Sequence, residues 1–141
     1  MTKRLCTLLL CLALPLMVQA SSEQLQISNA WIKQLPPVVP VRAGYITLVN
    51  TGKQPLRLVA VSGPDFDRVE LHETQMADGT MKMVQHEAFD IPPGGKLQLQ
   101  PGGKHLMLFD PTRPLVAGDS TELELEFDDG GRRSVRFEIR P

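Results

Sequence analysis

The sequence predicts an all-β fold, either a β-sandwich or a small barrel, from three observations. After residue 20, proline and glycine recur about every eight to twelve residues, which is the spacing of turns between short strands. The segments between these turns alternate apolar and polar residues. No stretch sustains the 3.6-residue period of an amphipathic helix. Together these features are typical of antiparallel strands stacked in two layers.

The first half of this region is expected to hold four strands. The first, residues 24–33, ends near Trp31, and the segment that follows contains three prolines, so it is expected to be a loop or an edge segment. The second strand reads AGYITLVN and is closed by the turn Asn50-Thr51-Gly52. This second strand spans residues 43–50. The other two strands of this half are expected at residues 56–62 and 66–73.

The second half is expected to hold five strands: residues 80–89, 96–100, 104–110, 121–127 and 133–140. The last two alternate cleanly, which places one apolar set toward the core. This set is Leu123, Leu125, Phe127, Val135, Phe137 and Ile139. No internal repeat, low-complexity segment or second domain is visible, so we expect one domain.

Residues 1–20 resemble a cleaved secretory signal peptide. Lys3 and Arg4 precede an apolar run, and Val18-Gln19-Ala20 is a typical cleavage site, which predicts a mature domain of residues 21–141. The expected location is the periplasm if the source is bacterial, with no stable membrane insertion after cleavage. An uncleaved anchor is one alternative. A lipoprotein attached through Cys11 is another, less favoured because Leu10 is not the small residue expected before a lipidated cysteine.

Cysteine content and charge exclude several classes of function. Cys6 and Cys11 both lie in the signal, so the mature chain can form no disulfide, thiolate metal site or cysteine nucleophile. Without Lys3 and Arg4, 13 basic residues stand against 16 acidic ones, a net charge of −3. A nucleic-acid-binding surface would need a basic patch, so nucleic acid is not an expected partner.

Four residues in the middle of the chain form a candidate metal site: His72, Met83, His105 and Met107, with the spacing H-x10-M-x21-H-x-M. Thioether sulfur and neutral imidazole are soft to borderline ligands. The metal that best suits this mixed set is Cu(I).

Alternation places the last two of these residues on one face of their strand. Leu106 and Leu108 are the apolar pair expected to face the core, so His105 and Met107 share the opposite face, about 6.5–7 Å apart along the strand.

The first two candidate ligands fall on a hairpin, since Asp78-Gly79 is a strong two-residue turn signal. That turn predicts a register in which His72 lies diagonal to Met83, within reach of long side chains. The predicted pairs are Met76 with Met81, Thr74 with Met83, and His72 with Gln85. The hairpin and the later strand would then supply a tetrahedral site of two nitrogens and two sulfurs on the outside of the sandwich.

The same four residues also allow structural interpretations that need no metal. A methionine on a strand is most often core filler, and a lone histidine is most often a surface residue. Four such residues together, on faces left for solvent, favour a metal site, with a Met-lined protein-binding surface as the structural alternative. An electron-transfer copper protein would need a cysteine ligand, and the mature chain has no cysteine, so this class of protein is excluded. Hydrolase motifs such as G-x-S-x-G and H-E-x-x-H are absent from the sequence, so we expect no enzyme.

The sequence resembles the periplasmic copper chaperones of the PCu(A)C type, also called the DUF461 family. The resemblance rests on the four-residue spacing and on five segments: AGYITLVNTG (43–52), VELHET (69–74), DGTMKM (78–83), PGGKHLML (101–108) and PLVAGD (114–119). It implies a Greek-key, cupredoxin-like β-sandwich with one Cu(I) bound near the surface. The implied ligands are His72, Met83, His105 and Met107.

The resemblance also implies delivery of copper to an acceptor, most often the copper subunit of cytochrome c oxidase, with Sco-type proteins as partners. Many relatives have a further methionine where this chain has Thr74, a role that Met76 or Met81 could fill. Some relatives carry a Met/His-rich tail, which this chain lacks after Pro141, so a second site of that kind is not expected. The alternative function is a secreted, metal-free binding or assembly module with a Met-rich surface.

Overall fold

The computed structural model describes residues 21–141, which fold as one all-β domain. The expected signal peptide (residues 1–20), with Cys6 and Cys11, lies outside the described residues. Across residues 21–141, no helix has both the length and the apolar character needed to cross a membrane.

Ten strands follow one short 3₁₀ turn, η1 (Ser21–Gln24). The strands are β1 (Leu25–Lys33), β2 (Val41–Asn50), β3 (Leu56–Ser62), β4 (Phe66–Ala77), β5 (Thr80–His86), β6 (Phe89–Ile91), β7 (Lys96–Leu99), β8 (Lys104–Pro111), β9 (Ser120–Phe127) and β10 (Arg132–Arg140). The expected single strand at 80–89 is two strands, because the chain leaves its pairing with β4 and then joins β3.

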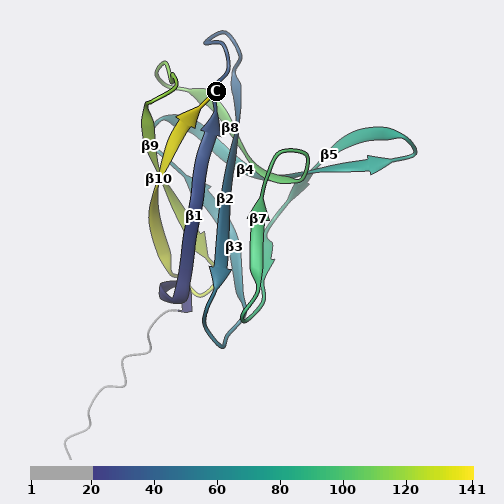
Figure 1. Cartoon of the computed structure of the whole chain (residues 1–141), viewed down its shortest axis with the longest axis vertical. Helices are drawn as coiled ribbons and strands as arrows, with labels where there is room; N and C mark the ends of the chain where they lie inside the picture. The colour runs from purple at the N-terminus through teal and green to yellow at the C-terminus, as the bar shows by residue number, and fades with distance from the viewer. Residues whose placement is uncertain (1–20) are drawn as a thin grey trace, which may run out of the picture.

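The strands form one continuous path of hydrogen-bonded neighbours, in the order β5-β4-β8-β2-β1-β10-β9-β3-β6, with β7 also paired to β2. The path bends back so that its two halves face each other across the core, as Figure 1 shows. β5 and β6 end the path and do not pair with each other, so the sheet is not closed into a barrel. The predicted sandwich is therefore confirmed.

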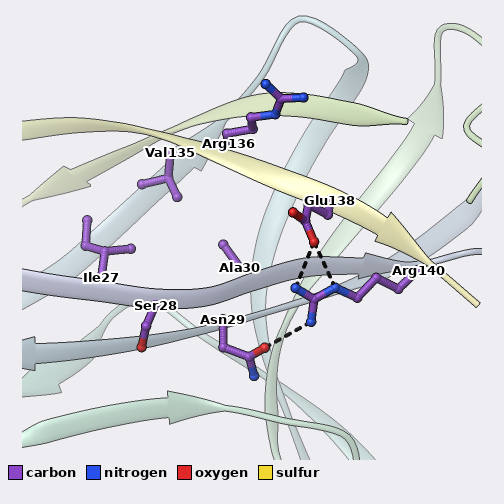
Figure 2. A pocket seen from close by; sticks show the side chains of 8 residues that line it. All are labelled: Ile27, Ser28, Asn29, Ala30, Val135, Arg136, Glu138 and Arg140. Carbon is purple, nitrogen blue, oxygen red and sulfur yellow. Dashed lines mark hydrogen bonds and ion pairs between the residues drawn. The ribbon is translucent and has the colours of Figure 1, made fainter. Parts of the chain in front are cut away.

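β1 joins the two halves because it pairs with β2 along one edge and with β10 along the other. It pairs antiparallel with β2 over most of its length and parallel with β10 at Trp31–Lys33. Its register with β2 shifts between Ser28 and Trp31, where Asn29 has a φ of 50°. Figure 2 shows Arg140 of β10 beside this bulge, donating to Glu138 and to Asn29 Oδ1. Among the residues that line the hollow there, Asn29, Glu138 and Arg140 thus pair with one another.

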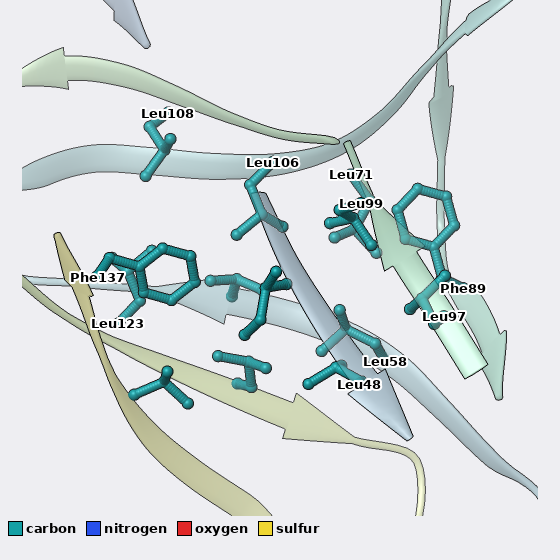
Figure 3. Close-up of a cluster of buried hydrophobic side chains, with 14 of the residues drawn as sticks. Leu48, Leu58, Leu71, Phe89, Leu97, Leu99, Leu106, Leu108, Leu123 and Phe137 are labelled. Carbon is teal, nitrogen blue, oxygen red and sulfur yellow. The ribbon is translucent and has the colours of Figure 1, made fainter. Parts of the chain in front are cut away.

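The core fills the space between the two halves (Figure 3). Leu106 and Leu108 are fully buried, as their alternation predicts. Fully burying one such side chain contributes about 1.5–3 kcal/mol. The six apolar residues expected to face inward from β9 and β10 are also buried. The core therefore fixes which face of β8 is left for His105 and Met107.

A hairpin extends from this body. β4 pairs with β8 only as far as Glu73, and beyond that residue its ladder partner is β5 alone. Figure 1 shows the end of β4 and β5 projecting away from the sandwich. We call residues 74–85 the hairpin arm. Its turn has positive φ at both Asp78 (51°) and Gly79 (73°), as a type I′ turn requires.

Candidate metal centre

Three neighbouring strands, β5, β4 and β8, carry the four candidate ligands. In the ladder between β4 and β8, His72 pairs with His105 and Glu70 with Met107. Between β4 and β5 the observed pairs are Met76 with Met81, Thr74 with Met83, and His72 with Gln85, so the predicted register is confirmed. Paired residues on antiparallel strands share a face, so all four candidate ligands lie on the outer face.

The two imidazoles lie close together. Their ring centroids are 6.0 Å apart and the rings are inclined by 43°. His105 is only 6% exposed and the side chain of His72 only 12%. The rings thus lie on the outer face, as expected, but they are shielded rather than open to solvent. Tyr45 on β2 is also buried, one residue after the position that pairs with Leu106. Its ring packs on that of Trp31, with 4.6 Å between the two ring centroids.

One nitrogen of His72 is held by a carboxylate. Its Nε2 lies 2.8 Å from Glu70 Oε2. Hydrogen bonding from His72, and then from Arg68, lowers the pKa of Glu70, so this carboxylate is ionised and can only accept. Nε2 therefore carries the proton in the neutral ring. Nδ1 is then left with its lone pair, buried and without a hydrogen-bond partner.

One nitrogen of His105 is held by the backbone. Its Nδ1 lies 3.0 Å from the carbonyl oxygen of Gly103, which can only accept, so Nδ1 donates and Nε2 keeps a free lone pair. The same carbonyl accepts the amide of Thr74 at 3.1 Å, which ties the base of the hairpin arm to the turn before β8. A metal-binding histidine usually has its other ring nitrogen fixed in this way.

The two thioethers differ in their surroundings. Met107 is half-buried, two residues from His105 on the same strand. Met83 lies on the hairpin arm, diagonal to His72, and is 53% exposed. The structure therefore brings His72, His105 and Met107 into adjacent positions, and Met83 would join them from the arm.

The donor set is selective. Two neutral nitrogens and two thioether sulfurs suit Cu(I), whereas Mg²⁺ and Ca²⁺ require oxygen ligands. Among residues 21–141, no group of three or more His, Cys, Asp or Glu side chains is placed to hold a metal ion. The donors on this face are therefore imidazole nitrogen and thioether sulfur.

Glu70 and Gly103 hold the two candidate imidazoles and were not predicted from the sequence. Glu70 could have been found, because it lies two residues before His72 and so shares its face on a strand. His86, the remaining histidine, lies outside the site: its Nε2 lies 2.9 Å from Glu73 Oε2 and its ring packs near Phe89.

Similarity to known proteins covers nearly all of the described chain. Residues 25–139 match the family model described as "Putative lipoprotein LpqE-like". A protein of Leifsonia xyli subsp. xyli (strain CTCB07), named "Putative lipoprotein Lxx21020", is 31% identical over 131 residues, 90% of this chain and 78% of that protein.

Two solved structures share the fold. The copper-bound PCuAC domain from PmoF2 superposes with a TM-score of 0.71 at 23% identity, covering 83% of this chain and 92% of that domain. The solution structure of Cu(I)-bound DR1885 from Deinococcus radiodurans has a TM-score of 0.62 at 30% identity, covering 87% and 85% of the two chains. At 23% identity the first likeness concerns the fold alone.

Proposed function

This chain belongs to the LpqE-like family, the PCu(A)C or DUF461 group that its sequence resembles, and from that membership we propose that it is an exported copper chaperone. It binds one Cu(I) through His72, Met83, His105 and Met107 and carries this ion to an acceptor protein. The relative from Deinococcus radiodurans, whose Cu(I)-bound form is known, supports the choice of metal.

The observation that carries the proposal is the state of the two imidazoles. Each has one nitrogen fixed by a hydrogen-bond acceptor, Glu70 for His72 and Gly103 for His105, and each has the other nitrogen free. The free Nδ1 of His72 is buried without a partner, which is costly unless something binds there. A cation between the two rings, held also by Met107, satisfies both lone pairs.

The ligand set suits transport rather than catalysis. Neutral donors hold Cu(I) without adding negative charge, and thioethers favour Cu(I) over harder ions. The two shielded imidazoles anchor the ion, while Met83 on the exposed arm can exchange with an incoming ligand. Stepwise exchange lets copper pass to an acceptor without being released as a free ion. No bond of a substrate is made or broken, so the protein is not an enzyme.

The site of action is outside the cytoplasm. The family model and the Leifsonia xyli relative are both described as lipoproteins, which favours export and the periplasm. These names also support the alternative that Cys11 carries a lipid, in place of cleavage after Ala20. The acceptor implied by the resemblance is the copper subunit of cytochrome c oxidase or a Sco-type protein.

A Cu(I) titration against a strong chromophoric chelator tests the proposal. We expect residues 21–141 to hold one equivalent against the chelator and His105→Ala to lose it while keeping the circular dichroism of the fold. His86→Ala is the matched control, because His86 bonds to Glu73 away from the candidate site, and it should retain copper.

Failure of the wild-type protein to compete with the chelator would contradict the chaperone proposal. It would favour the alternative, a metal-free module whose Met-rich arm recognises another protein. The exposure of Met76 and Met81 is the observation that supports this second function.

A further inference from the structure

The hairpin arm carries two thioethers, Met76 and Met81, that the four-residue centre does not use, beside Met83, which belongs to that centre. We propose that Met76, Met81 and Met83 form a second, outer Cu(I) site, from which copper passes to His72 and His105. This inference rests on the proposed function and extends it by naming where copper first enters the protein.

The register of the arm brings the three sulfurs together. Met76 and Met81 are direct cross-strand partners, flanking the Asp78-Gly79 turn. Side chains so paired have Cβ atoms about 4.5–5.5 Å apart. Met83 is the next residue of β5 on the same face, about 6.5–7 Å along the strand. Methionine has three rotatable side-chain bonds, so three sulfurs at these positions can converge on one ion.

These methionines have no packing role that would account for them. Met76 is 68% exposed, Met81 65% and Met83 53%. β5 has no buried residue, and the end of the arm projects away from the body (Figure 1). Core filler would be covered, and a surface strand without a function would carry polar side chains at these positions.

The two faces of the arm differ in chemistry. The Met-bearing face is completed by Thr74 and Gln85, which are neutral. Glu73, Gln75 and Lys82 lie on the opposite face, where Glu73 bonds to Gln75 and to His86. The carboxylate on the Met-bearing face of β4 is that of Glu70, which lies outside the arm and already bonds to Arg68 and His72. Within the arm, the paired positions of the Met-bearing face therefore offer a soft cation neutral sulfur donors. A cluster of thioethers of this kind selects Cu(I).

Met83 connects the two sites. It belongs to the outer cluster through its neighbour Met81, and it lies diagonal to His72 in the inner centre. Transfer inward is a ligand exchange: the bonds from copper to the sulfurs of Met76 and Met81 break as bonds to the nitrogens of His72 and His105 form. The ion stays Cu(I) throughout, so no electron or proton donor is required.

The test follows methionine methyl groups by NMR in residues 21–141, with the methyl carbons labelled and Cu(I) added without oxygen. We expect the first equivalent to shift the signals of Met83 and Met107. A second, more weakly held equivalent should shift those of Met76 and Met81. In the double variant Met76→Leu/Met81→Leu the second equivalent should be lost and the first retained. Leucine keeps the size and apolar character of methionine, so only the sulfur is removed.

His105→Ala separates this inference from the proposed function. It should lose the tight equivalent yet still show shifts of Met76 and Met81 with Cu(I). If the wild type binds one equivalent tightly and the signals of Met76 and Met81 do not move up to two equivalents, the chaperone stands and the outer site is overturned. If the double leucine variant still binds two equivalents, the outer site is likewise overturned. If the wild type binds no Cu(I), both proposals fail.

Discussion

His72 and His105 lie directly opposite each other on β4 and β8, with their ring centroids 6.0 Å apart. The two rings are oriented by different acceptors, a carboxylate for His72 and a backbone carbonyl for His105. Only the first of these acceptors can be changed by mutation without altering the main chain, so the role of Glu70 can be tested directly.

Glu70→Gln should weaken Cu(I) binding. The carboxylate fixes which nitrogen of His72 carries the proton and raises the basicity of the ring, and a neutral amide does both less well. Losing such an outer partner typically costs about 10–100-fold in metal affinity. Chelator competition measures the change, and the denaturation midpoint of the copper-free protein shows whether the fold is intact.

Glu73→Gln is the control for this variant. Glu73 lies on the same strand and its carboxylate lies 2.9 Å from Nε2 of His86, so the same kind of contact is altered on the opposite face. Copper affinity should not change in this variant. Equal losses in the two variants would show that the effect comes from charge alone and not from the position of His72.

Met83→Leu should lower Cu(I) affinity while leaving the copper-free protein as stable as the wild type. The side chain is 53% exposed on the arm, so its replacement by leucine removes little packing. Chelator competition and a thermal melt measure the two properties. An unchanged affinity would leave a centre made of His72, His105 and Met107 only.

Leu106→Ala should lower the stability of the fold, which Met83→Leu should leave unchanged. Leu106 lies between two candidate ligands in sequence but is fully buried in the core, and truncating such a leucine typically lowers the free energy of unfolding by about 2–5 kcal/mol. Urea denaturation measures this loss. The control is Met107→Leu, one residue away on the other face, which should lose copper affinity with a smaller change in stability.

The register of the hairpin arm could be predicted from the sequence because a two-residue turn at Asp78-Gly79 permits one pairing of the flanking strands. The facing of His105 and Met107 could be predicted because Leu106 and Leu108, which alternate with them, must be buried. Both conclusions depend on residues close in sequence. The local sequence pattern is enough to predict register or facing where a turn or a buried neighbour permits one arrangement only.

The pairing of β4 with β8 could not be predicted in the same way. The two strands are separated by more than twenty residues, and alternation says nothing about which strand lies beside which. The shielding of His105 follows from that pairing and was missed with it. The break between β5 and β6 was missed because no proline or glycine between Thr80 and Phe89 marks the point where the chain changes partner strand.

Gly79→Ala should loosen the hairpin arm and weaken copper binding through Met83. Gly79 has a φ of 73°, and a Cβ there would meet no atom within 4 Å, so the cost is conformational rather than steric. Such a backbone conformation costs about 1–2 kcal/mol for a residue with a side chain. Faster amide hydrogen exchange over the arm, together with chelator competition, would detect the change.

The matched variant is Gly130→Ala, in the turn between β9 and β10. Gly130 has a φ of 79° and equally open surroundings, so the same strain is introduced away from the arm. Its copper affinity should equal that of the wild type. A loss of affinity in this variant would mean that general destabilisation, and not the position of Met83, explains the effect of Gly79→Ala.

Asp65 should make the stability of the fold depend on pH in the acid range. The hydrogen bonds from Arg113, and to a lesser extent from Thr121, lower the pKa of this carboxyl in the folded protein. A lowered folded-state pKa stabilises the fold above the unfolded value, about 3.9, and that stabilisation disappears as pH falls through the folded value. The contribution is therefore complete at neutral pH and fades below about pH 4.

Asp65→Asn should accordingly be less stable than the wild type at pH 7, and the difference should shrink as the pH is lowered toward 3. Urea midpoints at several pH values measure it. Asp90→Asn is the control, since Asp90 pairs with Arg57 at an open surface where such ion pairs contribute little. A gap between wild type and Asp65→Asn that stays constant with pH would assign the role of Asp65 to hydrogen bonding that does not depend on its charge.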